Sequence, residues 1–379
     1  MIYFDSAATT KYKPDNVYDA FMYFARNIGV SPGRGSYSLG VEASRMLYQS
    51  RKTIGTYFGL KDPINVVFTK NSTEAINLFF YGFLNKGDHV LITCYEHNAV
   101  LRPLHALKEG GVIDYTVIKR EDIDKDGDYI LEKYGQTNTK LIVTTLASNL
   151  TGRIVFNENL FKTAKKANII TFMDASQGAG KIRIRMQEQS IDYLAFTGHK
   201  DLMGLPGVGG LCCKNKNTIR PLIQGGTGIL GDSYINPLVF PEGLEAGTLN
   251  MPAIWALKEA VEYCEEQFNA LHEKEEVLLT ILMTKLQDVP GIIIYDNDVK
   301  RVSTIGFNIE DIPSDKVVQY LDQNGVAVRG GIHCAILAHK ALGTVGRGVV
   351  RISLSPFNKE SEIEEFIRIL TKARKSLCI

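Results

Sequence analysis

The chain has 379 residues, of which 45% are apolar and 22% are charged. These proportions are ordinary for a globular protein, and the length allows one large domain and a smaller one. Lysine and arginine (43) nearly balance aspartate and glutamate (42), and the formal charge of +1 argues against nucleic acid or an anionic membrane as the main partner. No apolar run approaches the roughly 18 residues that a membrane span needs.

The N-terminal sequence MIYFDSAATT has no basic segment followed by an apolar stretch, so we expect no signal peptide. The cysteines form no Cys-x-x-Cys pair and show no Cys/His spacing typical of zinc. They are Cys94, Cys212, Cys213, Cys264, Cys334 and Cys378. We therefore expect a reduced, cytoplasmic protein with free thiols and no metal, in which most cysteines are inert packing residues.

Short apolar segments rich in β-branched and aromatic residues alternate with amphipathic segments through the first half of the chain. The expected strands are residues 65–69, 89–93, 140–145, 169–174 and 193–197. Helical patterns at 73–83 and 157–167 lie between them. Apolar strands without strict alternation are covered on both faces, and this order predicts βαβ units in a mostly parallel sheet.

Residues 252 to about 287 are expected to be helical, because apolar side chains recur at three- and four-residue spacing. After Gly291 the pattern changes to a compact α+β module. Its expected strands are 304–309, 326–329 and 349–354, and its expected helices are 314–324 and 360–377. We predict a large domain of residues 13–260 and a small domain formed by residues 1–12 and 261–379.

Two polar residues follow apolar strands and suit the chemistry of a carbonyl cofactor. Asp174 ends one strand, and Lys200 comes three residues after another. Ligands of open α/β sheets collect at the carboxyl ends of strands. A Schiff-base lysine needs a desolvated amine, and the ring nitrogen of pyridoxal phosphate needs a carboxylate. Alone, Asp174 is more simply a turn or cap residue and Lys200 a solvated lysine, but the pair favours a cofactor.

A third pattern, residues 69–75, runs from a strand end into a helix start. Ser72 and Thr73 are good N-cap types, and the free amides of a first helical turn suit a phosphate. A plain helix cap is the simpler interpretation of this segment taken singly. The glycines from Gly204 to Gly210 lack the strand–loop–helix setting of a dinucleotide loop, so we interpret them as a turn.

Taken together, eight segments in this order resemble the class V aminotransferase superfamily and, within it, the cysteine desulfurase and selenocysteine lyase family, closest to group II. They are 3–10 (YFDSAATT), 71–77 (NSTEAIN), 96–98 (EHN), 148–152 (SNLTG), 174–177 (DASQ), 198–200 (GHK), 245–248 (EAGT), and 329–335 (RGGIHCA) with Arg351. Three positions depart from the family pattern. They are Ser6 in place of asparagine, Leu249 in place of proline and Ile332 in place of a second histidine, and they bear on subgroup and substrate rather than cofactor.

The resemblance implies a two-domain fold of the aspartate-aminotransferase type that binds pyridoxal 5′-phosphate between its domains. It implies that Lys200 carries the cofactor and moves the substrate α-proton, that Asp174 holds the ring nitrogen proton, and that Cys334 accepts sulfur. The other implied cofactor contacts are Gln177 at the ring hydroxyl, His97 stacked on the ring with a role in proton transfer, and Ser72, Thr73, Thr197, His199 and the partner subunit's Thr248 at the phosphate. Asn149 and Arg351 are implied to hold the substrate carboxylate, which suits the guanidinium fork.

Each histidine also has a simpler interpretation as a hydrogen-bonded structural residue. The motif context favours a functional role for His97 and His199, whereas both interpretations stay open for His333. A buried arginine in an apolar strand needs an anionic partner, so Arg351 is not expected to be an idle surface residue.

The implied reaction converts L-cysteine to L-alanine and leaves a persulfide on Cys334, in a homodimer that delivers sulfur to an acceptor protein. A selenocysteine lyase would share every motif, and a true aminotransferase would leave Cys334 idle. A cofactor-binding scaffold that transfers sulfur without turnover is the alternative outside enzymes. The products of L-cysteine and L-selenocysteine separate these possibilities.

Overall fold

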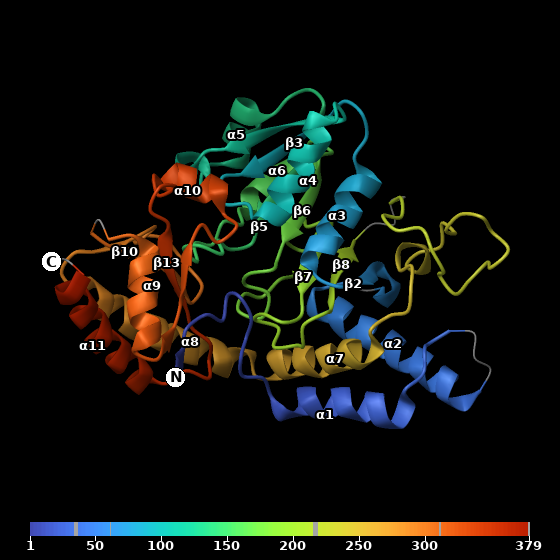
Figure 1. Ribbon diagram of the computed structural model, residues 1–379. Coiled ribbons are helices and arrows are strands. Elements are labelled where there is room, and N and C mark those ends of the chain that lie inside the picture. The colour runs from blue at the N-terminus through green and yellow to red at the C-terminus, as the bar shows by residue number, and fades with distance from the viewer. Residues whose placement is uncertain (34–36, 61, 215–218, 311, 378–379) are drawn as a thin grey trace.

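The computed structural model describes residues 1–379 except 34–36, 61, 215–218, 311 and 378–379, so Cys378 lies outside the described residues. A seven-stranded sheet forms the centre of the larger part of the chain (Figure 1). Its strands follow the order β2-β8-β7-β6-β5-β3-β4. All neighbours are parallel except that β8 runs antiparallel to both β7 and β2. The strands are β2 (Val66–Thr69), β3 (Asp88–Thr93), β4 (Ile113–Ile118), β5 (Thr139–Thr145), β6 (Ile170–Asp174), β7 (Tyr193–Thr197) and β8 (Gly209–Cys213).

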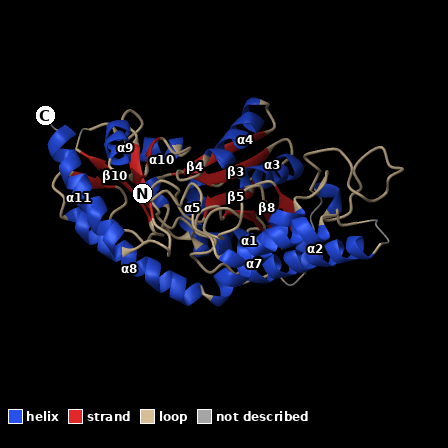
Figure 2. Cartoon of the chain, turned by 60° about the horizontal axis from the view of Figure 1, so that its bottom comes forward, coloured by secondary structure: helices blue, strands red, loops and turns tan. Residues whose placement is uncertain are grey.

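Helices cover both faces of this sheet, as its nearly continuous burial requires. On one face lie α3 (Ser72–Phe83) and α4 (Asn98–Glu109), which share a core with side chains such as Val90 and Phe172. On the other lie α2 (Ser38–Tyr57), α5 (Gly127–Tyr134), α6 (Glu158–Lys166) and α7 (Met251–Glu266), packed on alternate strand residues such as Leu91 and Met173. Figure 2 shows α1 (Asp15–Tyr23) and α7 together on this second side. Single turns occur at Phe24–Ile28, Pro63–Asn65, Arg120–Asp122 and Glu242–Leu244.

The C-terminal part of the chain forms an antiparallel sheet of order β12-β13-β10-β9 with helices packed on it. Its strands are β9 (Ile292–Ile294), β10 (Thr304–Ile309), β12 (Arg329–Gly331) and β13 (Val349–Ser353). Its helices are α8 (Phe268–Gln287), α9 (Ser314–Gln323) and α11 (Glu360–Leu377), whereas α10 (Ile336–Leu342) packs on the cores of the larger part. The N-terminal strand β1 (Ile2–Tyr3) pairs in parallel with β11 (Val326–Ala327), and the next residue, Phe4, is buried in the core of this part.

The expected α/β class with a mostly parallel sheet is confirmed, and the five expected strands of the first half lie within one residue of those observed. Residues 252–287 are helical as expected except at Gln267, where α7 ends and α8 begins. Two expectations are wrong. Residues 326–329 are not one strand, because β11 (Val326–Ala327) and β12 (Arg329–Gly331) belong to different sheets. Gly209 and Gly210 belong to β8 rather than to a turn. The division at residue 260 stays a prediction, and it would fall inside α7. None of the helices in the described ranges has the length and apolarity that crossing a membrane requires.

Candidate active site

The carboxyl ends of β6 and β7 place Asp174 and Lys200 in one region of the large part. Asp174 is the last residue of β6, and Lys200 follows β7 by three residues. Burial lowers the pKa of the Lys200 amine from its ordinary value, while the negative charge of Asp174 acts in the opposite direction. Arg351 and Cys334 are also close enough to influence this amine. A desolvated amine near a buried carboxylate is the arrangement expected from the sequence.

Asp174 makes local bonds as well. Its Oδ1 atom accepts hydrogen bonds from the backbone nitrogen of Ser176 (3.0 Å) and from the Ser176 hydroxyl. Such bonds are typical of an aspartate in a turn. One of the two carboxylate oxygens of Asp174 therefore has the local structural role that the sequence also allowed. The two bonds also fix the side chain in one orientation at the strand end.

His97 lies immediately before the first residue of α4, and its imidazole ring is neutral at neutral pH. Its Nδ1 atom accepts a hydrogen bond from the Ala99 backbone nitrogen (3.0 Å), so the ring serves as the N-cap of α4. Burial and the positive charge of Lys200 lower the pKa of His97 to about 4. With Nδ1 occupied as an acceptor, the proton of the neutral ring is on Nε2.

The start of α3 lies close against the sheet because β8 carries glycine there. A Cβ atom on Gly209 would come within 2.6 Å of the Phe196 carbonyl and 2.8 Å of the Asn71 backbone. The N-cap is Asn71, whose side chain accepts from the Glu74 nitrogen (3.0 Å), so the expectation that Ser72 or Thr73 caps α3 is wrong. Both instead lie in the first turn, where backbone amides are free for an anion.

Two further residues expected at the phosphate are Thr197, the last residue of β7, and His199, two residues after it. The Thr197 hydroxyl is buried and makes no hydrogen bond to any described residue. His199 Nδ1 lies 3.1 Å from the Thr9 hydroxyl, and burial lowers the pKa of His199 to about 4. An unpaired buried hydroxyl is costly, so a ligand or water is expected beside Thr197.

The N-terminal segment contacts several of these residues. Gln177 donates from Nε2 to the Ala7 carbonyl (2.8 Å). The Thr9 hydroxyl donates to the His199 carbonyl (3.1 Å), and the Thr10 hydroxyl donates to the Lys200 carbonyl (2.6 Å). The site is therefore built against residues 1–10, although no local pattern in this segment indicates a role in the site.

Arg351 lies on β13 and is buried. It donates from Nη1 to the Asn149 carbonyl (3.0 Å) and from Nη2 to Asp5 (2.7 Å). The anionic partner of Arg351 within the chain is therefore Asp5, which no local sequence pattern indicated. The Arg351 Nε atom and the Asn149 Oδ1 atom are buried without a partner among the described residues.

Cys334 is exposed and lies in a strained turn between β12 and α10. Both His333 and Cys334 have positive φ angles, of 52° and 56°. The turn is held by two bonds, from the Asn149 side-chain nitrogen to the His333 carbonyl (2.6 Å) and from the Asn98 backbone nitrogen to the Cys334 carbonyl (2.8 Å). These bonds join the turn to the residue after His97 and to the predicted substrate-binding asparagine.

His333 shows features of both interpretations. Its Nε2 atom lies 2.8 Å from the Val349 carbonyl, as expected of a structural histidine, and its ring stacks parallel to that of His339 at 6.3 Å. Its Nδ1 atom, however, is buried without a partner among the described residues. Burial lowers the pKa of His333 to about 3, so the ring is neutral.

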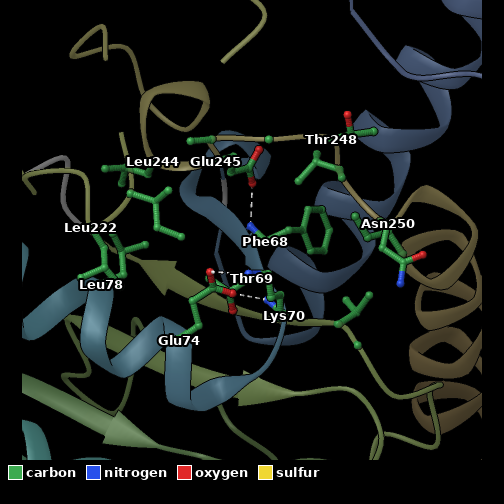
Figure 3. A pocket seen from close by; sticks show the side chains of 17 residues that line it. Phe68, Thr69, Lys70, Glu74, Leu78, Leu222, Leu244, Glu245, Thr248 and Asn250 are labelled. Carbon is green, nitrogen blue, oxygen red and sulfur yellow. Dashed lines mark hydrogen bonds and ion pairs between the residues drawn. The ribbon is translucent and has the colours of Figure 1, made fainter. Parts of the chain in front are cut away.

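Thr248 is exposed above a cavity of about 240 Å³ beside the start of α3 (Figure 3). The segment leading to it is anchored by Glu245, which is buried and accepts from Arg51 (2.5 and 2.7 Å) and from the Phe68 backbone nitrogen (2.6 Å). Within the chain, Thr248 therefore lies near the outer side of α3, at the surface.

The expectation that Cys94, Cys212, Cys213 and Cys264 are buried packing residues is confirmed. The residues that sequence reasoning missed are Asp5, Thr9, Thr10 and Asn98. The only sequence signal for them was their position inside the motifs at 3–10 and 96–98, because their partners are far away in the chain.

Residues 2–366 match the family described as Aminotransferase class-V. The chain belongs to this family. A probable cysteine desulfurase of Methanothermobacter thermautotrophicus is 30% identical over 96% of this chain and 92% of its own length. A cysteine desulfurase of Wigglesworthia glossinidia brevipalpis is 29% identical over 100% of this chain and 93% of its own length. The apo structure of a cysteine desulfurase from Thermococcus onnurineus superposes with a TM-score of 0.89 at 30% identity, covering 99% of this chain and 95% of that one.

Members of the class-V family depend on pyridoxal 5′-phosphate, and the residues of this chain fit that cofactor. The desolvated amine of Lys200 and the buried carboxylate of Asp174 match its aldehyde and its ring nitrogen. The close approach of α3 to Gly209 and the unpaired Thr197 hydroxyl match its phosphate.

Proposed function

We propose that this chain is a pyridoxal-phosphate-dependent cysteine desulfurase that converts L-cysteine to L-alanine and retains the sulfur on Cys334. The observation that carries the proposal is the exposed Cys334, held by Asn98 and Asn149 in a strained turn within electrostatic range of Lys200. The names of relatives that match nearly the whole chain support the same activity.

When bound, pyridoxal phosphate supplies an aldehyde that captures the amine of the substrate and a ring that withdraws electrons from its α-carbon. Lys200 Nζ is the amine that would hold the cofactor between turnovers and then move the α-proton. Its lowered pKa supports this role because a neutral amine is both the nucleophile and the base. Asp174 would keep the ring nitrogen protonated, and Gln177 would lie at the ring hydroxyl.

His97 would lie on the ring face as a neutral imidazole, in which Nε2 is the nitrogen available for proton transfer. The phosphate would be held by the first-turn amides of α3 together with the side chains of Ser72, Thr73, Thr197 and His199. The unpaired Thr197 hydroxyl supports this placement.

Arg351 and Asn149 would hold the substrate carboxylate. The unpaired Nε of Arg351 and the second N–H of the Asn149 amide support this role. Cys334 would then attack the substrate sulfur as a thiolate, forming an S–S bond while the bond from sulfur to the substrate β-carbon breaks. The products are L-alanine, which gains a proton at that carbon, and a Cys334 persulfide that an acceptor protein would discharge.

The working unit in this proposal is a homodimer in the cytoplasm. The exposed Thr248 would reach the phosphate site of the partner subunit, since it lies at the surface on its own chain. The five described cysteines are free thiols, which supports a reducing compartment.

Product analysis tests this function directly. The purified protein, loaded with cofactor, is incubated separately with L-cysteine and L-selenocysteine, and alanine, sulfide, selenide and keto acids are measured. Alanine from L-cysteine, with sulfur in equal amount, is the expected result. Alanine from L-selenocysteine alone would make the protein a selenocysteine lyase. A keto acid would make it an aminotransferase, and the lack of any product would leave a binding scaffold.

A further inference from the structure

Asp5 links two arginines at the edge of the candidate site. Its Oδ1 atom accepts from Arg351 Nη2 at 2.7 Å. Its Oδ2 atom accepts from Arg329 Nη2 at 2.8 Å and Nε at 3.1 Å. Only 13% of the Asp5 side chain is exposed, whereas 52% of the Arg329 side chain is exposed. Asp5 is therefore a nearly buried carboxylate that joins the buried arginine of β13 to the half-exposed arginine of β12.

The backbone around Asp5 is fixed by contacts with the small sheet. Asp5 forms an isolated parallel bridge with Ser353, and the Ser353 nitrogen donates to the Phe4 carbonyl at 2.8 Å. The Tyr3 hydroxyl lies 2.8 Å from the Thr9 carbonyl and closes the following turn. The position of the carboxylate is thus set by the protein before any ligand binds.

Arg351 keeps part of its guanidinium free. A guanidinium has five N–H groups, and the described contacts use one toward Asp5 and one toward the Asn149 carbonyl. Its Nε is buried without a partner. Bonds from Nη1 and from Nη2 fix the plane of the fork, so its remaining N–H groups are oriented before a carboxylate binds. A fixed fork loses less entropy on binding than a mobile one.

The charges of this triad favour an incoming anion. One carboxylate and two guanidinium groups sum to a formal charge of +1, so Asp5 stabilises the buried Arg351 without cancelling the attraction for a substrate carboxylate. Removing the Asp5 charge would raise the formal charge but release both side chains. Because Arg329 can turn to solvent, where its charge is screened, we expect the loss of orientation to dominate.

We infer that Asp5 is a positioning residue that sets the affinity for the α-carboxylate of the substrate through Arg351. This inference rests on the proposed function, because it takes an amino acid as the ligand. Asp5 itself touches neither substrate nor cofactor; it acts by holding the guanidinium.

The test measures binding of two ligands that differ only in the carboxylate. Cofactor-loaded protein is titrated with L-alanine and with L-alaninamide, and the change in cofactor absorbance gives the two dissociation constants. Asp5→Asn should weaken L-alanine binding about tenfold, the effect of losing one aligned charge-assisted bond, and leave L-alaninamide binding unchanged. Asp114→Asn is the matched control, since Asp114 lies on the edge strand β4 and pairs with the exposed Lys108. It should change neither constant.

Asp5→Glu keeps the charge but lengthens the side chain, so it should give a smaller loss with the same selectivity for L-alanine; it also carries the test if Asp5→Asn does not fold. Equal weakening of both ligands, or tighter L-alanine binding in Asp5→Asn, would overturn the inference. If wild-type protein releases alanine from L-cysteine while Asp5→Asn binds L-alanine normally, the inference fails and the proposed function stands. Absence of any response of wild-type protein to L-alanine and L-cysteine would overturn both.

Discussion

Lys200 offers the most direct test at the scale of a single residue. Burial lowers the pKa of its amine, so a larger fraction is neutral and reactive at neutral pH than for an exposed lysine. Borohydride reduction of cofactor-loaded protein should therefore attach the cofactor to the peptide that contains Lys200. Lys200→Ala should lose this attachment while retaining cofactor bound through its phosphate.

Lys13 provides the matched control for this experiment. Burial also lowers its pKa, and its charge is felt at His199, so it is a competing amine close to the site. Lys13→Ala should keep the reduced adduct on Lys200. Mass spectrometry of the digested protein measures both, and an adduct on Lys13 or any other lysine of the wild type would refute the assignment.

Cys334 decides whether the chain transfers sulfur. Cys334→Ala should retain the cofactor absorbance and still bind L-cysteine, but it should lose most alanine production, because no thiolate attacks the substrate sulfur. With L-selenocysteine as substrate, Cys334→Ala should lose less alanine production, because selenium leaves the substrate more readily than sulfur.

The control for Cys334 is Cys94→Ala. Burial raises the pKa of Cys94 to about 12, so this thiol is un-ionised at neutral pH and cannot replace Cys334. Wild-type protein treated with L-cysteine should carry one added sulfur on the Cys334 peptide by mass spectrometry. Normal alanine production by Cys334→Ala would exclude the desulfurase mechanism.

Local sequence was enough to indicate some site residues but not others. Asp174 and Lys200 could be predicted because each follows an apolar strand, and parallel strands end at the same edge of a sheet. The contact of Asp5 with Arg351 spans 346 positions of the chain, and no local pattern specifies such a pair. The caps were also ambiguous, because Asn71, Ser72 and Thr73 are all suitable types and only the backbone decides that Asn71 caps α3.

At the scale of elements, Gly209 determines how closely α3 approaches the sheet. Gly209→Ala would place a methyl group within 2.6 Å of the Phe196 carbonyl and displace the start of α3. We expect a loss of about 1–3 kcal/mol in the free energy of unfolding and weaker cofactor binding. Gly346→Ala is the control, since nothing lies within 4 Å of its Cβ position. Urea unfolding and cofactor titration measure the two effects, and equal behaviour of the two variants would contradict this account.

Asp296 joins elements of both parts of the chain. Its buried carboxylate accepts from the hydroxyls of Tyr95 (2.9 Å) and Thr151 (2.8 Å) and from Arg120 (2.8 Å). Its φ angle is 52°, a conformation that asparagine tolerates, so Asp296→Asn removes the charge without backbone strain. We expect a loss of about 3 kcal/mol in unfolding free energy. Asp298→Asn, at an exposed position nearby, should change it by less than about 0.5 kcal/mol in the same urea titration.

Periodicity predicted which elements exist better than where they break. Five strands of the seven-stranded sheet were predictable because they are short and mostly apolar. The edge strand β4 was not predicted, because Asp114, Tyr115 and Thr116 interrupt its apolar run. The break between α7 and α8 at Gln267 could not be predicted, because the apolar spacing continues across it. Only packing separates the two helices, since α7 lies on the large core and α8 on the small one. The strand β8 was missed because Gly209 and Gly210 have low strand propensity, and their requirement for close approach appears only in three dimensions.

Considered as a whole, the chain has a large core on each face of the seven-stranded sheet and a separate core in the C-terminal part. The candidate site lies where these parts meet, since Lys200 and Asp174 come from the large sheet and Arg351 and Cys334 from the C-terminal part. Residues 1–10 run along this junction and bond to both sides, to Ser353 and to His199. Changes in how the two parts pack should therefore alter substrate contacts before they alter the fold of either part.

The homodimer is the prediction that concerns the whole molecule. The segment from Leu230 to Val239 projects from the body at the right of Figure 1 and exposes several large apolar side chains. Tyr234 is fully exposed, and Leu238 is 75% exposed. Exposed apolar groups gathered on one segment are typical of interaction surfaces, and we expect a second copy of the chain to cover them, in line with the proposed role of Thr248 in the partner subunit.

The double variant Tyr234→Glu, Leu238→Glu should shift the protein from dimer to monomer, because burying two carboxylates in an apolar interface is costly. It should also weaken cofactor binding, since each phosphate site would lose the partner subunit's Thr248. Val277→Glu, which changes an exposed valine on α8 in the same way, should leave the dimer intact. Light scattering at several concentrations measures the mass, and cofactor titration measures the affinity. A wild-type monomer that turns over L-cysteine would refute the shared site, whereas assemblies built from several dimers would agree with it.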